Sequence, residues 1–218
     1  MLPDSQMLSP GQVASPTLAL TQNRVLRNTY ALLALSMVPT IFGAWLGIQF
    51  KLDLFATHPA MGLLAFFAIA VGFMYGVQRT KNSGWGVVLL LGFTFFMGIM
   101  LARMLGAVMS LTNGASLIAL AFGGTSIIFV SMATLASTVK RDLSGMGKFL
   151  FVGVIMLLVA GIANIFLQSS AFMLYDIKRV IDGGETNYIS ATLAIYLDLY
   201  NVFQSLLALL GFAGGERD

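Results

Sequence analysis

Two acidic residues flank one polar turn near the end of the chain. Asp176 comes seven residues before Gly183, and Asp198 comes ten residues after Tyr188. At a rise of about 1.5 Å per residue, helices would place these carboxylates about 10 and about 15 Å from the turn. Two antiparallel helices joined by that turn would therefore bring both carboxylates to nearly the same level.

The surroundings of Asp198 suggest what such a pair could do. Apolar sequence on both sides makes a charged Asp198 costly in lipid, so it is a functional candidate that needs a partner, and Asp176 is the natural one. Two carboxyl groups sharing a site of low dielectric constant cannot both ionise easily, so the pair would hold one proton and form a proton switch. Fully deprotonated, it would offer oxygen ligands suited to Ca²⁺. The alternative is a surface ion pair between Asp176 and Arg179, with Asp198 hydrogen-bonded inside the protein.

Three further polar residues interrupt apolar sequence. Arg103 either extends to the lipid head groups, which is the simpler interpretation, or balances the charge of a buried acid. Asn164 and Asn201 fit interhelical hydrogen bonding, with ion coordination as the alternative.

The composition defines the class of protein. With 58% hydrophobic residues, 10% charged residues and a mean hydropathy of +0.88, the chain is predicted to be an all-α polytopic membrane protein. The net charge of +3 does not indicate nucleic-acid binding, because the basic residues fall in short loops. Cysteine is absent, which excludes iron–sulfur and thiol chemistry, and no motif of an enzyme is present. We therefore expect neither catalysis nor a cofactor.

Apolar runs long enough to cross a bilayer recur along the chain, since a crossing needs about 20 residues. The predicted spans are 29–50, 59–78, 84–105, 115–138, 149–168 and 189–212, with a shorter apolar piece at 171–181.

The basic residues predict the orientation. Nine of them fall on one side if the N-terminus is cytoplasmic, and only Lys51, Arg103 and Arg217 fall on the other. The positive-inside rule then favours a cytoplasmic N-terminus, a periplasmic C-terminus and seven membrane-embedded segments.

The sixth segment is ambiguous. If the chain turns at 168–170, about a dozen residues remain before Asp182, or about 18 Å of helix, which predicts a shortened or re-entrant sixth helix. If it does not turn there, one long helix results, the span count is six and the C-terminus moves inside. We favour the shortened helix.

Residues 1–23 are rich in Pro, Ser and Gln and predict a flexible cytoplasmic tail, followed by one helical bundle domain over 24–218. The first apolar run begins after Arg24 and Arg27, which indicates an uncleaved membrane anchor rather than a signal peptide.

Several segments in order resemble the transmembrane Bax inhibitor motif family, and within it the bacterial branch that modulates the membrane AAA protease FtsH. The most specific is Gly-Gly-Glu-Thr-Asn-Tyr-Ile-Ser-Ala-Thr at 183–192, which continues into 199–203 and 211–213; others lie at 25–30, 92–98, 121–125, 140–144 and 163–168. The resemblance differs at 169–174, where the family has a longer apolar stretch, which again predicts a shortened sixth helix.

The resemblance implies a seven-helix bundle in the bacterial inner membrane, with the last helix surrounded by the others. It also implies FtsH as partner, with the protein a slowly degraded competitive substrate. The protease would grip the N-terminal tail, whose residues include Met1, Asp4, Gln12 and Asn23. Other members of the family are calcium-leak proteins with a pH-sensing aspartate pair, matched here by Asp176 and Asp198. Those members also carry an arginine near the end of helix two, where Arg79 lies.

Overall fold

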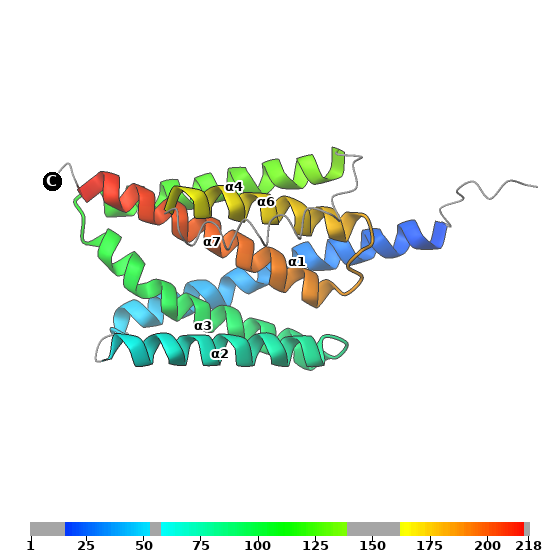
Figure 1. The fold of residues 1–218 in the computed structure, drawn as a ribbon, viewed down its shortest axis with the longest axis horizontal. Coiled ribbons are helices and arrows are strands. Elements are labelled where there is room, and N and C mark those ends of the chain that lie inside the picture. The colour runs from blue at the N-terminus through cyan, green and yellow to red at the C-terminus, as the bar shows by residue number, and fades with distance from the viewer. Residues whose placement is uncertain (1–15, 53–57, 139–161, 216–218) are drawn as a thin grey trace, which may run out of the picture.

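The computed structural model describes residues 16–52, 58–138 and 162–215, and every regular element in these ranges is a helix. Figure 1 shows them as one elongated bundle. The helices are α1 (Pro16–Gln49), α2 (Pro59–Thr80), α3 (Gly84–Met109), α4 (Gly114–Thr138), α6 (Ile162–Ile181) and α7 (Tyr188–Gly215).

Five of the described helices are long and apolar enough to cross a membrane: α1, α2, α3, α4 and α7. The predicted spans agree with them within a few residues at most ends, and α3 begins at Gly84 as predicted. The residues that end the apolar runs in sequence also begin helices in the structure. Pro59 begins α2, where its missing N–H group leaves no hydrogen bond unmade. The chain is a polytopic helical membrane protein.

The prediction of a shortened or re-entrant sixth helix is wrong. Helix α6 runs for 20 residues without interruption through Gln168, Ser169 and Ser170, so the chain does not turn there. Serine tolerates a helix interior because its hydroxyl can bond to a carbonyl group of the preceding turn. The described residues contain six helices, so the seven-helix count is not supported, and the alternative with six spans fits the helix count better. The start of α1 and the end of α7 nevertheless lie at opposite ends of the bundle, so the C-terminus does not lie on the side of the N-terminus as that alternative expected (Figure 1). Most of the predicted span 149–168 lies outside the described residues.

Helix α7 occupies the centre of the bundle. It contacts each of the other five described helices, as the family resemblance implied. Its first turns are buried without a break from Ile189 to Leu193, and Ile195, Tyr196 and Val202 are almost fully enclosed. Where α7 is buried in this way, its polar side chains must lie against partners, which makes its first half the natural place for a site.

The two ends of the bundle differ in charge. At one end, which we call the basic end, lie the start of α1, the α2–α3 turn and the α6–α7 turn (Figure 1). Six of the eight described basic residues lie there: Arg24, Arg27, Arg79, Lys81, Lys178 and Arg179, whereas Lys51 and Arg103 lie toward the opposite end. The α1–α2 and α3–α4 connections and the end of α7 lie at the other end, which we call the far end.

Helix α1 begins before the first apolar run. Residues 16–23, expected to belong to the tail, are helical, while residues 1–15 lie outside the described residues. The helix also packs very closely against α3, because a Cβ atom added at Gly98 would collide with the carbonyl oxygen of Thr40, and one added at Gly43 with that of Phe95. This contact fixes the middle of the bundle.

Candidate functional site

The two predicted aspartates lie side by side between α6 and α7. Their carboxyl groups are within hydrogen-bonding reach of each other, as the distances along the two helices predicted. Asp198 is 8% exposed, whereas Asp176 is partly buried. A carboxylate has no proton to donate, so a hydrogen bond between these two groups requires that one of them be protonated.

One oxygen of this pair has few possible partners. Oδ2 of Asp198 is buried and, unless it shares a proton with Asp176, has no hydrogen-bond partner in the described part of the chain. A buried polar atom without a partner is uncommon and costly, and such atoms concentrate where a protein exchanges protons or ligands.

A cavity of about 100 Å³ lies beside Asp176 at the basic end. Arg179 and Glu185 line it together with Asp176, and the Arg179 guanidinium lies 3.9 Å from Oε2 of Glu185. Gln78 of α2 and Ser190 of α7 line it as well, and the Ser190 hydroxyl bonds to Oε1 of Gln78 over 3.2 Å. The cavity is therefore a polar chamber built from three helices and one turn.

Asn187 holds this chamber together. Its side-chain oxygen accepts hydrogen bonds from the backbone N–H groups of Ile189 and Ser190, at 3.0 and 3.1 Å, which caps the N-terminus of α7. Its amide nitrogen donates to the carbonyl oxygen of Lys81 and to Oδ1 of Asn82, both at 2.9 Å. One side chain thus ties the α6–α7 turn to the α2–α3 turn.

The α6–α7 turn also meets the start of α1. Gly183 has φ of +78°, a conformation that favours glycine. A Cβ atom at this position would also meet the end of the Gln22 side chain, which could move aside, so the backbone conformation is the main reason for glycine here. The turn is consequently a junction of α1, α2, α6 and α7.

Arg179 does not form the ion pair with Asp176 that the alternative interpretation expected. Its ion pair is with Glu185, and its guanidinium acts on Asp176 from a greater distance across the cavity. The neighbouring Lys178 is buried and bonds to Asp182 one turn later.

The other predicted polar residues lie elsewhere. Arg79 is exposed, and the preceding residue, Gln78, lines the cavity instead. Arg103 lies toward the far end, in a separate groove. Asn201 is exposed on α7, so it does not make the expected contact inside the bundle.

The remaining predicted positions are only partly described. Asn164 lies in α6, and its side chain is outside the described residues. Of the tail residues, Met1, Asp4 and Gln12 are outside them too, whereas Asn23 is exposed on α1.

The sequence analysis missed Gln78, Glu185, Asn187 and Ser190. Asn187 carried a usable signal, because asparagine just before a long apolar run is typical of an N-cap. Gln78 and Ser190 carried none, since their meeting depends on how α2 packs beside α7.

The pair does not form a complete cation site. The described residues contain no group of three or more His, Cys, Asp or Glu side chains that could hold a metal ion. Ca²⁺ takes about six to eight oxygen ligands, more than two carboxyl groups supply, and the guanidinium of Arg179 opposes a cation nearby. These residues fit a proton-sharing pair better than a resident calcium ion.

The fold is that of a helical membrane protein with an acidic pair on its last two helices. Comparison with known families identifies which class this is. The family model described as inhibitor of apoptosis-promoting Bax1 matches residues 22–215, so the chain belongs to this Bax inhibitor family.

Bacterial relatives match almost the whole chain. The modulator of FtsH protease YccA of Escherichia coli K12 is 35% identical over 215 residues, which cover 92% of this chain and 95% of that protein. An uncharacterized membrane protein of Vibrio cholerae is 36% identical, covering 88% of this chain and 91% of that protein. An uncharacterized protein of Neisseria meningitidis is 34% identical, covering 90% and 94%.

Proposed function

We propose that this protein is an inner-membrane modulator of the FtsH protease, which binds the protease and competes with its other membrane substrates. The observation that carries the proposal is the similarity to the modulator of FtsH protease of Escherichia coli, which extends over 92% of this chain. The family match over residues 22–215 includes all but the first turns of the helical bundle.

The mechanism has two parts. A protease that pulls substrates from the membrane needs a terminal segment to grip, which the residues ahead of α1 would provide. The bundle would then resist extraction, because removing any helix breaks its packing against α7, and α7 contacts all five other described helices. The protein would occupy the protease for a long time and be degraded slowly.

The test is a pulse-chase of the full chain and of a form that begins at Pro16, so that α1 stays intact. In cells with active FtsH we expect the shortened form to persist longer, and in cells without it we expect both forms to be equally stable. A form with residues 1–15 scrambled is the control and should decay like the full chain. A shortened form that decays as fast as the full chain in the presence of FtsH would contradict the proposal.

The proposed orientation places the basic end in the cytoplasm, in keeping with the positive-inside rule. The chain contains no cysteine, so single cysteines report cleanly on each side. With Ser83→Cys at the basic end and Asn113→Cys at the far end, a membrane-impermeant thiol reagent added to spheroplasts should label only the second. Labelling of Ser83→Cys alone would show that the orientation is the opposite of the one proposed.

A second candidate function is a pH-gated leak of Ca²⁺, favoured by the adjacent carboxyl groups of Asp176 and Asp198 beside a polar cavity. Ca²⁺ would be cargo that passes this pair rather than a resident ion. Loss of the proton shared by Asp176 and Asp198 would change both the charge of this carboxyl pair and the packing of α6 on α7.

The test is Ca²⁺ flux into liposomes at several pH values. We expect Asp198→Asn to remove the pH dependence, whereas Asp182→Asn, which changes an exposed acid just after α6 that pairs with Lys178 rather than with Asp176 or Asp198, should retain it. A leak with the same pH dependence in Asp198→Asn would contradict the carboxyl switch, and absence of any leak would remove this function.

A further inference from the structure

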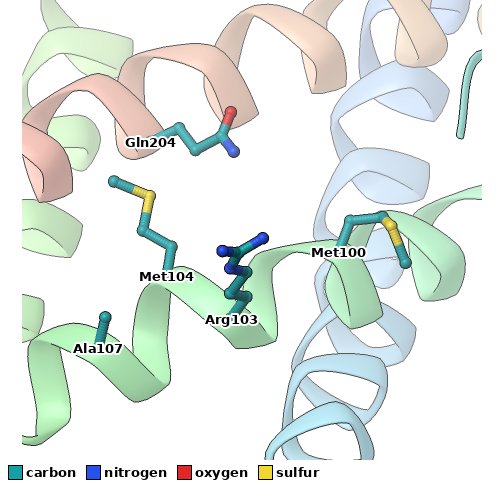
Figure 2. A pocket seen from close by; sticks show the side chains of 5 residues that line it. All are labelled: Met100, Arg103, Met104, Ala107 and Gln204. Atoms are coloured by element: carbon teal, nitrogen blue, oxygen red, sulfur yellow. The ribbon is translucent and has the colours of Figure 1, made fainter. Parts of the chain in front are cut away.

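A groove of about 390 Å³ lies toward the far end of the bundle, between α3 and α7. On α3, Met100, Arg103, Met104 and Ala107 line it, and on α7 Gln204 lines it. Figure 2 shows the Arg103 side chain projecting from α3 toward the side of α7 on which Gln204 lies. Gln204 comes six residues after Asp198, about 9 Å farther along α7, so the groove lies nearer the far end than the acidic pair does.

Contacts between the two helices close the groove at both ends. On one side the Tyr200 hydroxyl donates to the carbonyl oxygen of Met97 over 3.3 Å. On the other, the Val108 side chain lies so close to Gly211 that an added Cβ atom would be 3.1 Å from it.

The length of the groove corresponds to half a bilayer. From the level of Met97 to that of Val108, α3 advances eleven residues, or about 16 Å. The hydrocarbon core of a bilayer is about 30 Å thick, so this distance is close to the thickness of one leaflet.

Arg103 lies at the depth where a lipid phosphate can be reached. Helix α3 has 26 residues and is about 39 Å long, so it extends several ångströms beyond the hydrocarbon on each side. Arg103 is six residues before the end of α3, which puts its Cα atom only about 5 Å inside the hydrocarbon. An extended arginine side chain spans that depth.

The lining combines one cation with apolar and neutral groups. Among the described residues that form the groove, Arg103 carries the one formal charge, and Gln204 adds an amide that can donate hydrogen bonds. Met104 forms the inner wall, since it packs against the core cluster that contains Val108 and Leu207. Methionine adapts to irregular apolar partners, as an acyl chain requires.

We propose that the groove between α3 and α7 binds one phospholipid, with its phosphate on the Arg103 guanidinium and an acyl chain over Met100, Met104 and Ala107. Guanidinium and phosphate match in geometry and form paired, charge-assisted hydrogen bonds. Gln204 donates to the same headgroup from α7. The lipid fills the space between the two helices and does not depend on any role with FtsH.

The test is native mass spectrometry of the full chain in detergent, titrated with phosphatidylglycerol. We expect Arg103→Gln to weaken binding of the most tightly held lipid about tenfold, equivalent to about 1.4 kcal/mol. Lys51→Gln is the matched control, because it removes one positive charge at the same end of the bundle but outside the groove, and it should bind like the unmodified chain.

A second variant separates the groove from the charge. Ala107→Phe keeps Arg103 and fills the groove at an exposed position of α3, so it should fold normally and also lose the tightly bound lipid. Glycerol phosphate at millimolar concentration should not displace the lipid, since it has no acyl chain. Equal lipid binding by Arg103→Gln and Lys51→Gln, or displacement of the lipid by glycerol phosphate, would overturn the proposal.

Discussion

The two ends of α7 are held to their neighbouring helices in different ways. At the basic end, α7 meets α2 and α6 around a small polar cavity, where Asn187 and Ser190 hold their neighbours by direct hydrogen bonds. Toward the far end, α7 and α3 stand apart around a groove about four times larger, lined by methionine and alanine with a single charge.

The difference has a physical origin. Near the basic end, turns bring unpaired backbone groups together, and asparagine and glutamate side chains satisfy them. At the groove, both helices have their backbone bonds satisfied internally, so side-chain packing and the hydrogen bond from Tyr200 to Met97 hold them together. The basic end should therefore be rigid and sensitive to substitution, and the groove tolerant.

The contact between α1 and α3, which lies between these regions, should give the largest effect. Gly98→Ala places a methyl group against the Thr40 carbonyl oxygen, so the helices must separate, and we expect a loss of about 3 kcal/mol in the free energy of unfolding. Gly123→Ala is the control, because an added Cβ atom there meets nothing within 4 Å. Equal unfolding curves in a denaturing-detergent titration would show that the contact is looser than described.

Loss of the Asn187 side chain tests the basic end itself. Asn187→Ala removes the cap of α7 and both links to the α2–α3 turn, for an expected loss of about 2 kcal/mol. The exposed Asn201→Ala on the same helix should change stability by less than about 0.5 kcal/mol. If the two variants unfold alike, the hydrogen bonds of Asn187 do not stabilise the turn. The less stable variant should also be the faster degraded wherever FtsH acts.

Filling each hollow compares the two regions directly. Ala191→Leu would put an apolar group into the polar cavity and leave Asp176 and Glu185 less well hydrated, for an expected loss of about 1–2 kcal/mol. Ala107→Leu in the groove should leave stability unchanged within about 0.5 kcal/mol. A larger loss of stability for Ala107→Leu than for Ala191→Leu, measured in the same titration, would contradict this difference between the cavity and the groove.

The smallest effect is expected for the ion pair of the cavity. Glu185→Gln removes the charge opposite Arg179, whose side chain is 49% exposed, but keeps an oxygen for the Asn187 N–H group. A half-exposed pair at 3.9 Å contributes little, so we expect a change of less than about 0.5 kcal/mol that disappears at high salt. A larger loss that persists in salt would mean that Glu185 acts through a structural bond rather than its charge.

The sequence predicted the helices far better than their lateral packing. Runs of apolar residues and the breaks at Pro59 and Gly84 located four of the five apolar helices to within a few residues, and the start of α1 at Pro16 was missed because its first turns are polar. The alignment of Asp176 with Asp198 followed from helix rise alone.

What failed depended on contacts between helices. Ser169 and Ser170 resemble a turn in sequence, yet the helix continues because neighbouring helices surround it, with Ser170 buried. Arg79 and Gln78 are adjacent in sequence, and only the packing of α2 decides that Gln78 faces the cavity. Periodicity in one helix does not encode which neighbour it meets.

The most direct test of the central claim uses purified FtsH and a second membrane substrate in the same lipid vesicles. Added full-length protein should slow degradation of that substrate in proportion to its amount, while it is itself degraded slowly, and the form that begins at Pro16 should have much less effect. If degradation of the second substrate is unchanged at every ratio, the protein does not modulate the protease, and the calcium leak becomes the function to pursue.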